Sequence, residues 1–161
     1  MADDKTNVMR LLEQSDIKYC SHVYEWDGKT APDGVSVAKM MGFDPDSVFK
    51  TLVAKGAKGS YYVFDIPVSN TLDLKKAAKS VGEKSIEMLP QKELFPLTGY
   101  VHGGCSPIGM KKKFTTVFDE TCILYDTIYV SAGKVGVQIE IAPDDLISVT
   151  DATTADLVVE K

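Results

Sequence analysis

The segment 47–55 (SVFKTLVAK) constrains the fold more than any other part of the chain. Its residues alternate as in a strand, with Val48, Lys50, Leu52 and Ala54 on one face and Phe49, Thr51 and Val53 on the other. Both faces are mostly apolar. This pattern predicts a strand that lies inside a sheet and is covered on both sides.

Lys50 places a cation among the apolar side chains of this strand. Lysine is almost never fully buried without a partner, so two interpretations are open. In the first, the stem of Lys50 packs while its ammonium group reaches water. In the second, the ammonium group points into a pocket, where it holds a phosphate or polarises a carbonyl group.

Short helices and short strands alternate irregularly along the rest of the chain. Helices are expected over 6–15, 35–41, 73–81 and 90–97, in one turn at 119–124, and from Pro143 onward. Further strands are expected over 18–24, 61–66, 86–89, 114–118, 127–131 and 137–141. Because no regular βαβ alternation appears, the prediction is an α/β (α+β-like) fold. Its mixed, largely antiparallel sheet is curled or closed into a barrel and surrounded by short helices.

Composition narrows the class of protein. The 161 residues are 44% hydrophobic and 25% charged, which predicts a single folded domain over 1–161. No apolar run approaches the ~18 residues that span a membrane, and residues 1–5 do not resemble a secretory signal. The three cysteines are too few and too dispersed for a disulfide framework, so we expect a reducing, cytoplasmic location and no membrane partner.

A glycine-rich segment, 101–110 (VHGGCSPIGM), runs directly into Lys111, Lys112 and Lys113. Adjacent glycines can turn several N–H groups toward one point, which suits a carboxylate, a phosphate or a developing oxyanion. The alternative is a rigid turn followed by solvated lysines. A net charge of −5 excludes binding of a polyanion such as DNA by bulk charge, so a nucleic acid would need a local patch.

Several familiar motifs are absent. Gly104 and Gly109 have the spacing of a P-loop, but Met110 follows where that motif needs lysine. His22, His102 and the carboxylates form no ligand spacing, so no metal is predicted. A hydrolase that uses Cys105 as nucleophile is a minor hypothesis, because no orienting group is evident. Cys20 and Cys122 are expected to be buried as small apolar residues.

Four pieces of the sequence, in this order and spacing, resemble one family. They are 48–52 (VFKTL), 103–112 (GGCSPIGMKK), 128–133 (IYVSAG) and 140–143 (EIAP). Together they resemble the YbaK family of freestanding aminoacyl-tRNA editing proteins, typified by bacterial Cys-tRNA(Pro) deacylase. This family is related to the editing domain inserted in bacterial prolyl-tRNA synthetases. The resemblance extends over about residues 6–157.

The resemblance implies a closed or nearly closed β-barrel and a reaction in which a mischarged amino acid is removed from the 3′ end of a tRNA. The substrate's own groups would cleave the ester, without a metal, a cofactor or a side-chain nucleophile. Lys50 would anchor the terminal nucleotide or polarise the ester, and the N–H groups of Gly103 and Gly104 would face the ester carbonyl. The substrate pocket would include Tyr24, Thr51, Ser106, Ser131 and Gln138, and tRNA phosphates would meet Lys111, Lys112 and Lys113.

Two departures from the family bear on which amino acid fits. Residues 30–33 (TAPD) lack the aromatic residue that many members carry there, and Gln138 stands where some relatives have a small polar residue. Cysteine on tRNA(Pro) is the expected substrate. A prolyl-tRNA synthetase is an expected partner, because the resemblance implies no anticodon-reading domain. The alternative from another class is a non-catalytic module that binds a charged tRNA end or a synthetase.

Overall fold

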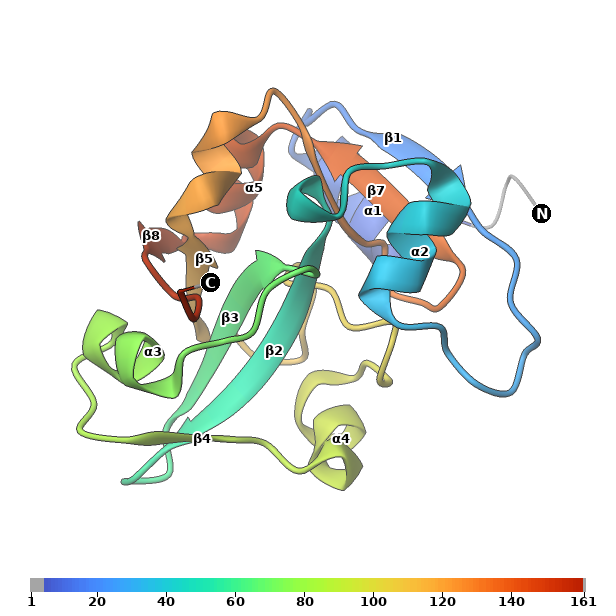
Figure 1. Ribbon diagram of the computed structural model, residues 1–161. Coiled ribbons are helices and arrows are strands. Elements are labelled where there is room, and N and C mark those ends of the chain that lie inside the picture. Colours follow the sequence, from blue (N-terminus) through green and yellow to red (C-terminus); the bar gives the residue numbers. More distant parts are fainter. Residues whose placement is uncertain (1–4, 161) are drawn as a thin grey trace.

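The computed structural model describes residues 5–160, and within that range two sheets are surrounded by short helices (Figure 1). Of the stretch 1–5, for which no secretory signal is expected, all but Lys5 lies outside the described residues. None of the helices between residues 5 and 160 has both the length and the apolar character needed to cross a bilayer.

The smaller sheet is antiparallel and has the order β1-β7-β6. Its strands are β1 (Cys20–Val23), β7 (Val137–Ile141) and β6 (Ile128–Ser131). The larger sheet has the order β4-β2-β3-β5-β8. Its strands are β4 (Ile86–Met88), β2 (Phe49–Gly56), β3 (Tyr61–Pro67), β5 (Thr115–Asp119) and β8 (Thr153–Ala155).

Pairing in the larger sheet is antiparallel on both sides of β2, and parallel between β3 and β5 and between β5 and β8. The predicted mixed, largely antiparallel architecture is therefore confirmed. Of the two forms that the prediction left open, a curled sheet and a closed barrel, the closed barrel is not the one observed, because among the described strands one isolated bridge, between Val48 and Tyr129, links the two sheets. The prediction also omitted β8, which has only three residues.

Strand β2 lies between β4 and β3, as its two apolar faces predict. Leu52 and Ala54 pack with Phe64 on one face, while Val53 packs with Val63 on the other. The strand is therefore covered on both faces, and its first residues lie where the two sheets meet.

Five α-helices surround the sheets: α1 (Asn7–Gln14), α2 (Gly34–Met41), α3 (Leu74–Ser80), α4 (Leu94–Thr98) and α5 (Pro143–Thr150). Three short 3-10 helices complete the described elements: η1 (Pro45–Ser47), η2 (Gln91–Glu93) and η3 (Glu120–Leu124). The side chain of Thr6 accepts a hydrogen bond from Met9 N at the start of α1, as expected of a cap. Gly42 ends α2 in the left-handed conformation, with φ 72°.

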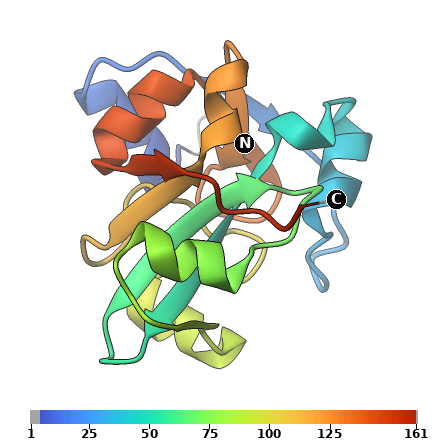
Figure 2. The ribbon, with the colours of Figure 1, turned by 60° about the vertical axis from the view of Figure 1, so that its left-hand side comes forward.

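Two apolar clusters form most of the core. One joins the smaller sheet to α1 and α5, and the other joins the larger sheet to α3 (Figure 2). Cys122 is buried as expected, but Cys20 is exposed because β1 is an edge strand. Leu74, the first residue of α3, is 40% exposed, whereas Ala77 and Ala78 on the same face of the helix are buried.

Candidate active site

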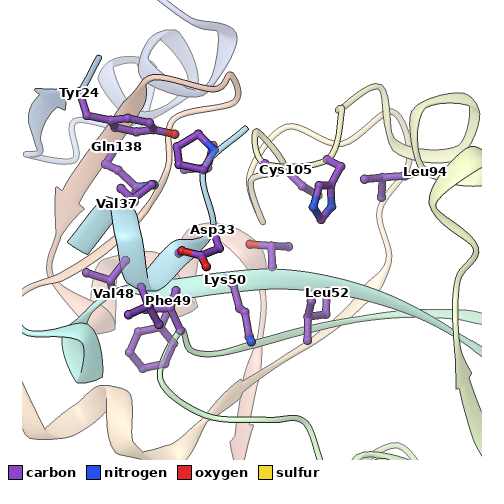
Figure 3. Close-up of a pocket in the computed structure, with 18 residues that line it drawn as sticks. Tyr24, Asp33, Val37, Val48, Phe49, Lys50, Leu52, Leu94, Cys105 and Gln138 are labelled. Atoms are coloured by element: carbon purple, nitrogen blue, oxygen red, sulfur yellow. The ribbon is translucent and has the colours of Figure 1, made fainter. Parts of the chain in front are cut away.

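A cavity of about 450 Å³ lies where β2, the smaller sheet, α2 and the loop after α4 meet (Figure 3). Six residues singled out from the sequence line it: Tyr24, Lys50, Thr51, Gly103, Ser131 and Gln138. Asp33, Leu94, His102 and Cys105 also line it. The fold thus brings the beginning of β2, the ends of the smaller sheet and the glycine-rich loop to one place.

Lys50 is half-buried in this cavity and has no carboxylate within ion-pair distance among residues 5–160. Burial lowers the pKa of its ammonium group, and the negative charge of Asp33 opposes that effect. Asp33 is itself occupied as the cap of α2, where its carboxylate accepts a hydrogen bond of 2.7 Å from Ser36 N. The three N–H donors of Lys50 therefore stay available for an anion or a carbonyl oxygen.

Thr51, the next residue of β2, shares a hydrogen bond with Asp65, which lies directly opposite on β3. The distance from Thr51 Oγ1 to Asp65 Oδ1 is 2.5 Å. Asp65 is fully buried, and burial raises the pKa of its carboxyl group to about 8. Sequence reasoning did not select this residue; its one signal is a lone carboxylate in the apolar strand 61–66.

Gly103 lines the cavity with φ +86°, a conformation that residues with a Cβ rarely adopt. A Cβ at this position would lie 2.5 Å from the Cβ of Ala31. The structure gives the N–H of Gly103 no protein acceptor within residues 5–160. The loop thus needs glycine here, and the glycine leaves one N–H group free beside the cavity.

The expectations for Gly104 and Ser106 need correction. The N–H of Gly104 donates to Val101 O over 3.0 Å, and Gly104 is buried against the backbone of Lys134 and Val135 instead of lining the cavity. Ser106 is fully buried outside the cavity lining, where its Oγ accepts a hydrogen bond from Ile108 N. Both residues stabilise the loop. Their adjacency to Gly103 in the sequence does not place them at the cavity.

Gln138 and Ser131 form a cross-strand pair of β7 and β6 on the wall of the cavity. Ser131 Oγ accepts a hydrogen bond of 3.1 Å from Gly133 N. Gln138 is 8% exposed, and its buried Oε1 has no hydrogen-bond partner within residues 5–160. Tyr24, 6% exposed, completes this wall. The wall therefore offers one polar atom, Gln138 Oε1, whose hydrogen-bonding capacity is not used within residues 5–160.

Cys105 lines the cavity but is poorly suited to act as a nucleophile. Burial raises the pKa of its thiol to about 12, and the charge of Asp65 adds to the effect. The thiolate is the reactive form, so this cysteine is inert at neutral pH. The structure therefore argues against the hypothesis of a hydrolase that depends on Cys105.

The three consecutive lysines lie on the surface, outside the lining of the cavity. Lys111 lies against α4, with its Nζ 5.5 Å from the ring centroid of Phe95. Lys113 forms an ion pair of 2.9 Å with Asp151, and Lys112 is exposed. They are separate from the cavity lining and could contact only a ligand that extends beyond it.

The chain is similar to known proteins over nearly its whole length. The family model described as aminoacyl-tRNA editing domain matches residues 29–149. A protein of Enterococcus faecalis named as a Cys-tRNA(Pro)/Cys-tRNA(Cys) deacylase, EbsC, is 45% identical over 153 residues, 95% of this chain and 93% of that protein.

Solved structures agree with this assignment. One described as a trans-editing enzyme for prolyl-tRNA synthetase is 26% identical with a TM-score of 0.80, and covers 96% of this chain and 99% of its own. A hypothetical protein with a TM-score of 0.85 is 20% identical and covers 96% of this chain and all of its own, which supports the fold alone. The chain therefore belongs to the aminoacyl-tRNA editing domain family.

Proposed function

We propose that this protein is a trans-editing aminoacyl-tRNA deacylase that removes a mischarged small amino acid, with cysteine on tRNA(Pro) as its first substrate. One observation carries the proposal. In a chain 45% identical to a protein named as such a deacylase, one cavity is lined by both Lys50 and Gly103. Within residues 5–160, the ammonium group of Lys50 has no carboxylate partner and the N–H of Gly103 has no protein acceptor. In this proposal residues 1–161 form one editing domain.

The bond to be broken is the ester between the carboxyl carbon of the amino acid and a ribose oxygen of the terminal nucleotide. Attack on that carbon moves negative charge onto the carbonyl oxygen, and preorganised donors stabilise this charge. The N–H of Gly103 and the ammonium group of Lys50 are suitable donors on the cavity lining. Lys50 could instead hold a phosphate of the terminal nucleotide, and both roles require its charge.

The attacking group in this proposal comes from the substrate. The thiol of an esterified cysteine attacks its own carbonyl carbon, a C–S bond forms, and the ribose oxygen leaves and takes up the proton of the thiol. Water then opens the cyclic thioester. For an amino acid without a thiol, a water molecule assisted by the neighbouring ribose hydroxyl group takes the place of the sulfur. The protein's contribution is positioning and charge stabilisation, which the polar wall of Ser131 and Gln138 supports.

The partner of the reaction is a charged tRNA, whose 3′ end enters the cavity. In this proposal Lys111, Lys112 and Lys113 contact phosphates outside it, where their exposed side chains can reach a polyanion despite the net charge of −5. A prolyl-tRNA synthetase is the proposed second partner, since it can supply the recognition of tRNA(Pro).

Deacylation of a panel of charged tRNAs tests the proposal: Cys-tRNA(Pro), Ala-tRNA(Pro), Pro-tRNA(Pro) and Cys-tRNA(Cys). We expect rapid loss of cysteine from both tRNAs and little loss of proline. Addition of prolyl-tRNA synthetase should then increase the preference for tRNA(Pro). Binding of the panel without turnover would contradict the proposal and favour the non-catalytic binding module.

A further inference from the structure

Asp65 is a buried carboxyl group that the reaction outlined above does not use. It is 0% exposed on β3, and its Oδ1 shares the hydrogen bond of 2.5 Å with Thr51 Oγ1. Its Oδ2 is buried and has no hydrogen-bond partner in the part of the chain that the structure describes. A buried carboxylate with one hydrogen bond and no counter-charge is costly, so the neutral acid is the form that this environment favours.

The groups around Asp65 do not supply a counter-charge. Thr51 faces it from β2, whereas Lys50 projects from the opposite face of that strand. The thiols of Cys105, from the glycine-rich loop, and Cys122, from η3, both respond to its charge, and both have raised pKa values. Asp119 on β5 and Asp144 in the first turn of α5 are the other carboxylates that act on Cys122. Asp119 accepts hydrogen bonds from Leu157 N and Thr121.

The hydrogen bond between Asp65 and Thr51 can run in two directions, because a hydroxyl group has one proton and can also accept. An ionised Asp65 can only accept a hydrogen bond, so the hydroxyl group of Thr51 must donate to the carboxylate. It then presents only a lone pair to the cavity. A neutral Asp65 can donate its own proton to Thr51 Oγ1. The hydroxyl proton of Thr51 is then free to point into the cavity that Thr51 lines.

We propose that Asp65 is a positioning residue: as the neutral acid it donates to Thr51 Oγ1 and thereby makes Thr51 a hydrogen-bond donor toward the substrate. This inference rests on the proposed function, in which the acceptor is the ester carbonyl oxygen of the aminoacyl-tRNA. Thr51 then provides a donor in addition to Gly103, while Lys50, on the opposite face of β2, holds a phosphate of the terminal nucleotide. Deprotonation of Asp65 reverses the bond and removes that donor.

The activity test compares Asp65→Asn with the wild type. The carboxamide of asparagine donates to Thr51 Oγ1 at every pH and so fixes the arrangement of the neutral acid. Burial raises the pKa of Asp65 to about 8, so wild-type kcat/KM relative to Asp65→Asn should fall about tenfold between about pH 7 and about pH 9. The ratio cancels the titration of Lys50 and of the substrate thiol, which both proteins share.

Two Thr51 variants control for the mechanism. Thr51→Val removes the hydroxyl group. The ratio of kcat/KM of Thr51→Val to that of the double variant Thr51→Val/Asp65→Asn should therefore not change across the same pH range. Thr51→Ser, which keeps a hydroxyl group, should restore the fall. A level ratio in the wild-type background, with both proteins folded by circular dichroism, would overturn the inference.

Difference infrared spectroscopy gives a readout that does not depend on activity. Wild type minus Asp65→Asn should show the carbonyl band of a protonated carboxylic acid at neutral pH, and this band should disappear with a midpoint near that of the activity ratio. Absence of the band at neutral pH would overturn the inference whatever the activity. If instead the band titrates but no charged tRNA is deacylated by the wild type, the proposed function fails, and with it the role of Thr51 toward the ester.

Discussion

Substitution of Gly103 by alanine should distort the cavity in a way that a second substitution partly repairs. Gly103 has φ +86°, where a residue with a Cβ pays ~1–2 kcal/mol. The new Cβ would lie 2.5 Å from the Cβ of Ala31, which is overpacking that typically costs ~1–3 kcal/mol. The free energy of unfolding should therefore fall by roughly 2–5 kcal/mol. For a chain of this size, each kcal/mol lowers Tm by about 2–4 °C.

The two contributions can be separated with a double-mutant cycle. Ala31→Gly removes the atom that the new Cβ meets but leaves the positive φ of residue 103 in place. Thermal and denaturant unfolding of the wild type, both single variants and the double variant should give a coupling energy of ~1–3 kcal/mol in favour of the double variant. A coupling energy below ~0.5 kcal/mol would refute the reasoning, since it would mean that the loop does not approach Ala31 closely.

Three further predictions concern the cavity and its surroundings. Because the folded pKa of Asp65 is about 8 and an ordinary aspartate titrates near ~3.9, the native state keeps a proton that the unfolded chain loses. As pH rises between these two values, the free energy of unfolding of the wild type should fall relative to that of Asp65→Asn by up to ~1.4 kcal/mol per pH unit. Equal pH dependence of the two proteins in urea titrations would contradict this. Cys105→Ala should keep turnover of Ala-tRNA(Pro) within about threefold, because the buried, protonated thiol is not the nucleophile, and a loss above about a hundredfold would restore that hypothesis. Replacing Lys111, Lys112 and Lys113 by glutamine should raise KM for charged tRNA and flatten its dependence on salt while kcat is unchanged; an unaltered salt slope would exclude the contact with phosphates.

The local structure of this chain could largely be predicted, because short-range patterns determine it. Alternation of apolar residues over 47–55 predicted β2 and its central place, and the helix expected over 35–41 is α2. Strand β8 could not be predicted in this way. Its three residues form a strand only because they pair in parallel with β5, more than thirty positions earlier in the chain.

The site could be predicted only in part, for a related reason. The resemblance to a family selected Lys50, Thr51 and Gly103, and the fold does bring them to one cavity. The use of each N–H group in the glycine-rich loop depends on tertiary contacts, so the sequence could not show that Gly104 already donates to Val101 O. Asp65 was missed because its burial and its bond to Thr51 follow from the pairing of β2 with β3, not from its neighbours in sequence.

The most direct test of the central claim is multiple turnover of Cys-tRNA(Pro), supplied in excess, by the wild type and Lys50→Met. The matched control is Lys55→Met, on the same strand but outside the cavity. We predict sustained release of cysteine by the wild type and by Lys55→Met, and a rate about ten- to a hundredfold lower for Lys50→Met, because a lost charge-assisted contact costs ~1.5–3 kcal/mol. Release that stops after one equivalent, or a Lys50→Met rate within about threefold of the wild type, would contradict the assignment of this cavity as an editing site that works through Lys50.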